Sequence, residues 1–234
     1  MKAIVLAAGR GERMRPLTDR VPKPLLRAGG RSLIEWQILR LVRAGVTQIV
    51  VNVSHFADQI EQALGRGEQF GAHIEYSQER VALETAGGIT QALSLLGAEP
   101  FIAVNADIYC EYDYARLKPA TEALTQTRVP WAAYLVLVPN PEHHLRGDFS
   151  LASDGVVRPN EADSLTFSGI GVYQPWMFSG IADGERQALG PMLHAGARTG
   201  IVRGERFEGR WMDIGTPQRL ARLQALLGEF DERA

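Results

Sequence analysis

Short apolar runs that alternate with helix-patterned segments constrain the fold of this chain more than any other feature. The runs KAIVLA at 2–7, QIVVNV at 48–53 and FIAVN at 101–105 lack the regular polar alternation of a half-exposed strand. Each is therefore expected to be a strand buried on both faces of a sheet. One more strand and three helices complete this half of the chain, at 73–77 and at 33–44, 57–64 and 88–96. This order predicts right-handed crossovers and a mostly parallel sheet covered by helices on both faces.

Turn residues and periodicity set the expected elements of the second half. Helices and strands are expected at 113–127, 131–138, 166–173, 191–197 and 217–230. A hairpin is expected over 150–157, with Asp154 and Gly155 in a primed turn, since glycine lacks the Cβ that opposes a positive φ. No internal repeat or linker-like segment interrupts the 234 residues, so a single domain is expected.

Charge and cysteine content exclude several classes of protein. The chain has 25 Lys and Arg against 27 Asp and Glu, a net charge of −2. It therefore lacks the positive field that nucleic acid or an anionic membrane surface requires, and neither is expected as a partner. Cys110 is the single cysteine, which excludes an internal disulfide and a cysteine zinc site and predicts an inert thiol. No apolar stretch approaches 18 residues, so a cytoplasmic protein is expected.

The loop after the first strand combines glycines with cations. Gly9 and Gly11 follow the carboxyl end of that strand, which is where open α/β sheets bind ligands. Glycines let backbone N–H groups approach a phosphate closely, and Arg10, Arg13 and Arg15 add cationic donors. This pattern predicts a phosphate site, with a plain turn and solvated arginines as the alternative.

Neighbouring residues exclude two common nucleotide motifs. Met14 stands where a dinucleotide fingerprint needs its third glycine, and the loop has no Gly-Lys-Ser/Thr of the Walker A type. Lys23 lies between Pro22 and Pro24, which restrict the backbone on both sides. The lysine is thereby presented to a phosphate at low entropic cost.

Two further segments carry candidate ligands. Asp107 lies two residues beyond a buried strand, where a carboxylate suits Mg²⁺. Asp213 precedes a Gly-Thr-Pro, and a cap or turn role is its alternative. In LETAGG at 83–88, Glu84 and Thr85 can hydrogen-bond a base edge or a ribose. The following glycine pair permits close approach of the backbone to a ligand, and packing of a helix on the sheet is an equal alternative.

Taken in order, these motifs resemble the sugar-1-phosphate nucleotidyltransferases. The stretches that carry the resemblance span nearly the whole chain: GRGERMRPLTDRVPKPL at 9–25, LETAGG at 83–88, VNAD at 104–107, FSGI at 167–170 and WMDIGTP at 211–217. Ala86 departs from the usual LETGGG of the family. The resemblance implies the nucleotide-diphospho-sugar transferase fold, a Rossmann-like three-layer α/β sandwich. Residues 1–110 would form its nucleotide-binding half and residues 111–234 its sugar-phosphate-binding half.

The resemblance also implies roles for individual residues. Arg13, Lys23 and Asp107 would be catalytic, and Asp107 and Asp213 would share one Mg²⁺. The nucleotide would contact Ala8, Gly9, Gly11, Glu12, Arg13, Lys23, Glu84, Gly88 and Asn105. The sugar phosphate would contact Asn140, Asp148, Ser168 and Gly169.

Finer features imply the substrates. Glu12, LETAGG and GDF at 147–149 are most similar to family members that join UTP to N-acetylmuramate 1-phosphate in cell-wall recycling. VVRPN at 156–160 lacks the Glu-Lys-Pro of hexose-specific relatives. The alternatives are GTP with mannose 1-phosphate, or a non-catalytic subunit that binds a sugar nucleotide. A monomer or small homo-oligomer without the β-helix domain of larger relatives is expected.

Charged loop residues complete the expectations. The lactyl carboxylate of such a sugar needs a cation or an amide, for which Arg146 and Arg158 are candidates, with solvation as the alternative for each. His143 and His144 are adjacent in an extended loop, so their side chains point apart. Solvated positions are therefore expected for both histidines, rather than metal ligation.

Overall fold

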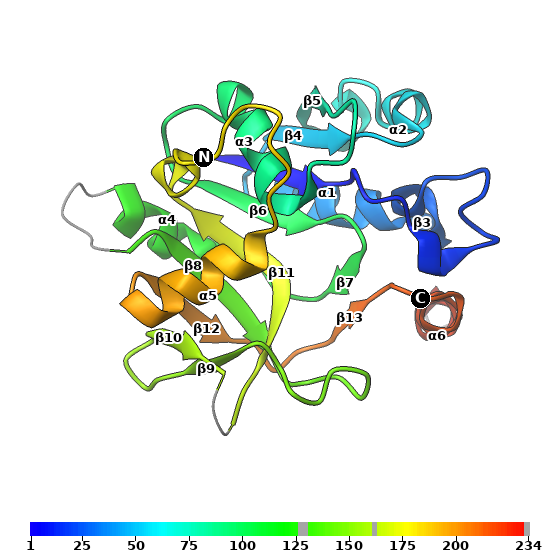
Figure 1. Ribbon diagram of the computed structural model, residues 1–234. Coiled ribbons are helices and arrows are strands. Elements are labelled where there is room, and N and C mark those ends of the chain that lie inside the picture. The colour runs from blue at the N-terminus through cyan, green and yellow to red at the C-terminus, as the bar shows by residue number, and fades with distance from the viewer. Residues whose placement is uncertain (126–130, 161–162, 232–234) are drawn as a thin grey trace.

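A seven-stranded sheet runs through the centre of the computed structural model, which describes residues 1–125, 131–160 and 163–231 (Figure 1). The strands lie side by side in the order β12 (Val202–Arg206), β8 (Ala133–Val138), β11 (Thr166–Tyr173), β6 (Phe101–Asn105), β1 (Lys2–Leu6), β4 (Gln48–Val53) and β5 (His73–Gln78). Strand β11 is antiparallel to both of its neighbours, and the other neighbouring pairs are parallel. The mostly parallel central sheet is therefore confirmed.

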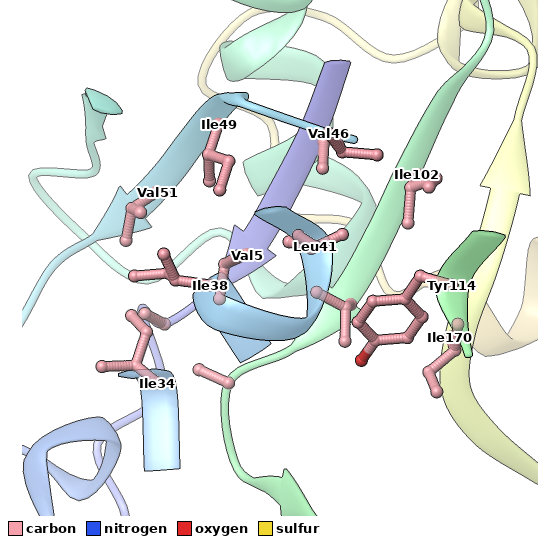
Figure 2. Close-up of a cluster of buried hydrophobic side chains, with 14 of the residues drawn as sticks. Val5, Ile34, Ile38, Leu41, Val46, Ile49, Val51, Ile102, Tyr114 and Ile170 are labelled. Carbon is pink, nitrogen blue, oxygen red and sulfur yellow. The ribbon is translucent and has the colours of Figure 1, made fainter. Parts of the chain in front are cut away.

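Alternate residues of the central strands point to opposite faces of the sheet, and each face has its own helices. In β1, Ala3 and Val5 enter one hydrophobic cluster, while Ile4 enters another. The first cluster includes side chains from α1 (Leu33–Arg43), α2 (Ala57–Leu64) and α4 (Lys118–Thr125), and the second from α3 (Glu84–Leu96) and α5 (Leu189–Thr199). Figure 2 shows the first cluster, where Ile38 and Leu41 of α1 lie over the sheet. The three-layer sandwich is thus confirmed.

A third, smaller cluster connects the last helix to the loop after β1. Helix α6 (Pro217–Asp231) contributes Leu220, Leu223 and Leu227, and the 3-10 helix η1 (Glu12–Met14) contributes Met14, which is fully buried. Met14 therefore has a packing role at the position where a dinucleotide fingerprint would have glycine. Its burial ties the glycine-rich loop to the C-terminal helix.

Short elements complete the described part of the chain. The two-stranded ribbons are β2 (Arg27–Ala28) with β3 (Arg31–Ser32), β7 (Ile108–Cys110) with β13 (Trp211–Asp213), and β9 (Phe149–Leu151) with β10 (Val157–Pro159). The other 3-10 helices are η2 (Lys23–Leu25), η3 (Glu68–Phe70), η4 (Tyr114–Leu117) and η5 (Pro175–Phe178). In the described ranges, no helix combines the length and the apolar character needed to span a membrane.

Several element boundaries differ from the sequence predictions. Helix α3 begins at Glu84 rather than at 88, because Ala86 and Gly87 donate their first-turn N–H groups to the Gln187 carbonyl, at 3.0 and 3.1 Å. The helix expected at 113–127 is divided into η4 and α4, and Asp113 caps η4 through the Ala115 N–H at 3.0 Å. Positions 126 and 127 lie outside the described residues. Strand β8 begins two residues late, and α5 extends two residues beyond each end of its predicted range.

The hairpin of β9 and β10 is present, but the predicted primed turn is wrong. A primed turn centred on Asp154 and Gly155 needs a positive φ at Asp154. Only Gly155 of the two has one, at 83°, and its N–H donates to the Ala152 carbonyl at 2.9 Å. The chain therefore turns over residues 152–155 and leaves through a left-handed glycine, which is the usual three-residue hairpin loop.

A buried glutamine links α1 to the segment that follows β6. Gln37 is fully buried, and its Nε2 donates to the Ile108 carbonyl at 2.5 Å. Its Oε1 accepts from the Tyr114 hydroxyl, also at 2.5 Å. Burial raises the pKa of Tyr114 well above its usual value, so the hydroxyl keeps its proton and donates. These bonds hold the backbone directly after Asp107 against α1.

We expect Gln37→Leu to lower the free energy of unfolding by about 2 kcal/mol in urea denaturation. The substitution deprives the buried Tyr114 hydroxyl of its acceptor, and an unsatisfied buried polar group costs roughly 1–3 kcal/mol. Gln62→Leu, on the exposed face of α2, is the matched control and should change stability by less than about 0.5 kcal/mol. Equal effects of the two substitutions would contradict the role given to Gln37.

Candidate active site

Three parallel strands end at the same edge of the sheet and open a cavity there. The register pairs Leu6 at the end of β1 with Asn52 in β4 and Asn105 in β6. The cavity at this edge has a volume of about 320 Å³. It is lined by Leu6, Ala7, Ala8, Gly9, Lys23, Pro24, Asn52, Glu79, Ala82, Glu84, Thr85, Asn105, Ala106, Asp107 and Arg186. Ligands of open α/β sheets bind at this position.

The two glycines of the first loop have different tasks. Gly11 has a φ of 65°, and a Cβ there would lie 3.0 Å from the Lys23 Cβ. Its carbonyl accepts from the Thr18 hydroxyl at 2.9 Å, which fixes the loop further. Gly9 lines the cavity, and a Cβ on it would meet nothing within 4 Å. Gly11 therefore shapes the loop, while Gly9 leaves its backbone open to a ligand.

Lys23 and Asp107 form an ion pair at the wall of the cavity. Lys23 is 8% exposed, and its Nζ donates to Oδ2 of Asp107. A lysine at this depth needs a negative partner, because an unpaired buried charge is costly. The pair joins the loop after β1 to the segment that follows β6.

Asp213 lies beside Asp107 because β13 pairs with β7. Asp213 is opposite Ile108 in this ribbon, and the Ile214 N–H donates to the Asp107 carbonyl at 2.8 Å. Arg219, at the start of α6, donates from Nη1 to both Asp213 carboxylate oxygens, at 2.6 and 2.5 Å. The two aspartates that are 106 positions apart in sequence thus lie on hydrogen-bonded segments, each paired with a cation.

The two histidines of the 139–147 loop each contact a carboxylate. His143 Nε2 is 2.8 Å from Oδ1 of Asp213, and His144 Nε2 is 2.9 Å from Oδ1 of Asp148. Both side chains stay partly exposed to solvent, at 45% and 40%, as the sequence predicts, and each also has a carboxylate partner. The sequence argument that adjacent side chains point apart holds, but each side chain meets a different aspartate.

Arg13 lies on the Asp213 side of the site. It is exposed and is not among the residues that line the 320 Å³ cavity. A Cβ on Gly215 would lie 3.3 Å from Arg13 Nη2 and 2.5 Å from Arg219 Nη2. The two guanidinium groups therefore flank Gly215. Arg219 adds a cation that sequence reasoning missed, because it lies beyond the WMDIGTP motif.

A chain of buried hydrogen bonds connects the first loop to the start of α3. The Ala7 N–H donates to Asn52 Oδ1 at 2.7 Å, and Asn52 Nδ2 donates to Glu79 Oε1 at 2.6 Å. The Leu83 N–H donates to Glu79 Oε2 at 2.8 Å. Burial raises the pKa of Glu79, and the hydrogen bonds from Leu83 and Asn52 oppose that rise. Sequence reasoning missed both side chains, although an asparagine inside the apolar run QIVVNV was a usable signal.

The glycine pair of LETAGG serves close packing. A Cβ on Gly88 would lie 2.4 Å from Glu79 Oε1, and one on Gly87 would lie 2.3 Å from the Glu185 carbonyl oxygen. Of the two alternatives, the packing role is thus observed for both glycines. Glu84 does line the cavity, and its carboxylate pairs with Arg186 at 2.7 Å. Glu12, the first residue of η1, is exposed and does not line it.

The residues predicted for the sugar phosphate divide into two groups. Asp148 lines an adjoining cavity of about 280 Å³, which also includes Asn105. Gly169 packs against Asn105, since a Cβ there would lie 2.5 Å from Asn105 Nδ2. Asn140 donates to the Ser164 carbonyl at 2.9 Å and accepts from Thr166, and the Ser168 hydroxyl accepts from the Ile170 N–H. Of the four, Asn140, Ser168 and Gly169 line neither of these two cavities. Asn140 lines a different cavity, which also includes Asp213 and Arg219.

The candidate donor set for a metal consists of two carboxylates. Throughout the described ranges, no group of three or more His, Cys, Asp or Glu side chains is arranged to hold an ion. Asp107 and Asp213 supply hard oxygen donors, and Mg²⁺ commonly binds through one or two carboxylates, with water and phosphate oxygens as its other ligands. These two residues therefore fit such an ion. Cys110 does not contribute, because burial raises the pKa of its thiol to about 11.

Sequence comparisons with known proteins give matches over nearly the whole chain. The nucleotidyl transferase family matches residues 2–229. The N-acetylmuramate alpha-1-phosphate uridylyltransferase of Neisseria meningitidis serogroup B is 49% identical over 98% of this chain and 100% of its own length. The mannose-1-phosphate guanyltransferase of Aspergillus oryzae is 33% identical, over 93% of this chain and 62% of its own length.

Among solved structures, HddC of Yersinia pseudotuberculosis has the same fold. Its TM-score is 0.79 at 20% identity, over 98% of this chain and 99% of the other. The family match covers the strands, the loop after β1, and both aspartates of the site. The chain belongs to the nucleotidyl transferase family.

Proposed function

We propose that this protein transfers a uridylyl group from UTP to N-acetylmuramate 1-phosphate. The products are the corresponding nucleotide sugar and pyrophosphate. The observation that supports this proposal best is the 49% identity, over the full length, to the N. meningitidis enzyme whose name states this reaction. The ion pair of Lys23 and Asp107 at the cavity wall is a structural observation that also supports the proposal.

The reaction is an in-line displacement at phosphorus. A phosphate oxygen of the sugar phosphate attacks the α-phosphorus of UTP, and the bond from that phosphorus to the oxygen that bridges to the β-phosphate breaks. Pyrophosphate leaves with the electron pair of that bond. Because the nucleophile is already an anion, the site needs no general base. Its tasks are alignment of the two substrates and compensation of their negative charge.

The chain's own groups suit these tasks. The backbone of Ala8 and Gly9 lines the cavity and is expected to donate to the triphosphate. Lys23 is held at the cavity wall by Asp107, so its charge is positioned before the substrate arrives. Arg13, near Gly215, is expected to reach the leaving pyrophosphate. Asn105 lines both cavities and is therefore expected to contact both substrates.

Asp107 and Asp213 would hold a divalent cation, for which we propose Mg²⁺. When bound, such an ion neutralises the reacting phosphates as a Lewis acid. Lys23 and Arg219 balance the two carboxylates in the structure, at distances short enough for charge-assisted hydrogen bonds. Each carboxylate that would hold the ion thus already has a cationic side chain beside it.

We expect Asp107→Asn to reduce pyrophosphate release from UTP and N-acetylmuramate 1-phosphate, with Mg²⁺ present, at least about 100-fold. That factor corresponds to roughly 3 kcal/mol of lost transition-state stabilisation, within the several kcal/mol that a bound metal ion contributes. Asp154→Asn, on the exposed tip of the β9–β10 hairpin, is the control of equal charge change and should retain wild-type activity. Near wild-type turnover by Asp107→Asn, with unchanged thermal unfolding, would refute the role of Asp107.

The substrate pair has a separate test. Pyrophosphate release is measured for UTP, GTP, dTTP and CTP, each with the 1-phosphates of N-acetylmuramate, N-acetylglucosamine, glucose and mannose. We expect the highest kcat/KM for UTP with N-acetylmuramate 1-phosphate. Highest activity with GTP and mannose 1-phosphate would instead support the guanylyltransferase alternative, and activity with no pair would support a non-catalytic binding protein.

A further inference from the structure

The second cavity continues directly from the first. The 320 Å³ cavity and the 280 Å³ cavity share three lining residues, Glu84, Thr85 and Asn105. Asp148, from the segment before β9, stands in the second cavity but not in the first. A substrate whose phosphate lies near Asp107 can therefore extend past Asn105 into the second cavity. We call this second cavity the α5 cavity, because α5 supplies Leu189, Gly190, Leu193 and His194 to its wall.

The walls of the α5 cavity are mainly apolar. Phe149 and Phe167 come from β9 and β11, and Leu189 and Leu193 come from α5. The Phe149 ring packs on the His194 ring with 4.6 Å between centroids. A plain hexose presents hydroxyl groups in nearly every direction, which such walls leave without partners. The lining instead suits a sugar substituent that has alkyl carbon.

The same cavity has partners for an anion at its α5 end. The N–H groups of Leu189 and Gly190 are in the first turn of α5, where no intrahelical acceptor exists, and no side chain caps this helix. The helix dipole adds positive potential at this end. His194 contributes the only imidazole among the residues that line the cavity.

The carboxylates that border the α5 cavity are already paired. Asp148 accepts from the Phe167 N–H at 2.8 Å and contacts His144, and Glu84 pairs with Arg186. Their charge is thus partly compensated within the protein. Arg146 and Arg158, the sequence candidates for a sugar carboxylate, are exposed, and neither is among the residues that line the two cavities.

We propose that the α5 cavity is the subsite for the carboxyethyl ether of the acceptor sugar, with its methyl group against Phe149 and Phe167 and its carboxylate at the start of α5. This inference rests on the proposed function, since that substituent is what distinguishes N-acetylmuramate from N-acetylglucosamine. It assigns acceptor selectivity to Gly190 and His194, which no sequence motif indicated. Glycine at 190 adds no side chain to the wall of the subsite.

Gly190 allows the subsite to be filled without strain. A Cβ there would meet nothing within 4 Å, and the residue lies in a regular helix without a positive φ. Gly190→Leu therefore adds an isobutyl group to the cavity wall. The probes are UDP-N-acetylmuramate and UDP-N-acetylglucosamine, which share every group except the carboxyethyl ether. Calorimetric titration gives a Kd for each probe without requiring turnover.

We expect the wild-type protein to bind UDP-N-acetylmuramate at least about tenfold more tightly than UDP-N-acetylglucosamine, as one or two charge-assisted hydrogen bonds provide. Gly190→Leu should abolish this preference, while its Kd for UDP-N-acetylglucosamine stays within about threefold of wild type. His194→Ala, which removes the imidazole without filling the cavity, should reduce the preference as well. Gly228→Leu is the matched control, since Gly228 is an exposed glycine of α6 with equally open surroundings, and it should behave as wild type.

The subsite assignment would be overturned if the wild-type protein bound the two probes with equal affinity. It would also be overturned if Gly190→Leu kept the preference, or if that variant lost affinity for both probes equally. Uridylyl transfer by the wild-type protein separates this failure from failure of the proposed function. If UTP and N-acetylmuramate 1-phosphate release no pyrophosphate, the proposed function fails. If they react and Gly190→Leu still prefers UDP-N-acetylmuramate, only the assignment of the α5 cavity fails.

Discussion

The pairing of Lys23 with Asp107 is the contact on which the rest of the site depends. A lysine that is 8% exposed requires a nearby negative group. Asp107, the second residue after β6, provides it. This ion pair holds the loop after β1 against the segment after β6. The Asp107 carbonyl in turn accepts from the Ile214 N–H at 2.8 Å, which adds the end of β13. Three segments that are remote in sequence thus meet around one ion pair.

A net charge of −2 and a site for two phosphate-bearing substrates are compatible because the cations are local. Lys23 and Arg13 come from the first loop, and Arg219 comes from the start of α6. Met14 is fully buried against α6 in the same small cluster as Leu220 and Leu223. The C-terminal helix therefore has two tasks, since it delivers one cation and holds the loop that carries the others. The electrostatic potential at the site therefore depends on this packing rather than on the net charge of the chain.

Elements whose signals are local were predictable from the sequence. The capping box of Ser32 and Glu35 forms at the start of α1, and the apolar runs form the buried strands β1, β4 and β6, because both depend only on neighbouring residues. Contacts across the fold were not predictable. Asn52 reaches Glu79 only because β4 and β5 pair in the observed register. His143 contacts Asp213 from the loop after β8, which is remote from β13 in sequence. The glycine pair of LETAGG was ambiguous for the same reason, since its neighbours come from Glu79 and the 185–187 segment.

Asn105, at the end of β6, lines both cavities of the site. The register of β11 against β8 shifts between Phe167 and Ile170, and within that irregularity Gly169, with a φ of 81°, packs on Asn105. On one side of Asn105 lie Lys23 and Asp107; on the other lies the α5 cavity. Lys23 comes from η2, Asp107 from the segment after β6 and Asp213 from the end of β13, while the apolar walls come from β9, β11 and α5. If the α5 cavity is the proposed subsite, substitutions in α5 would alter which sugar is accepted and leave the groups proposed to act on phosphate in place.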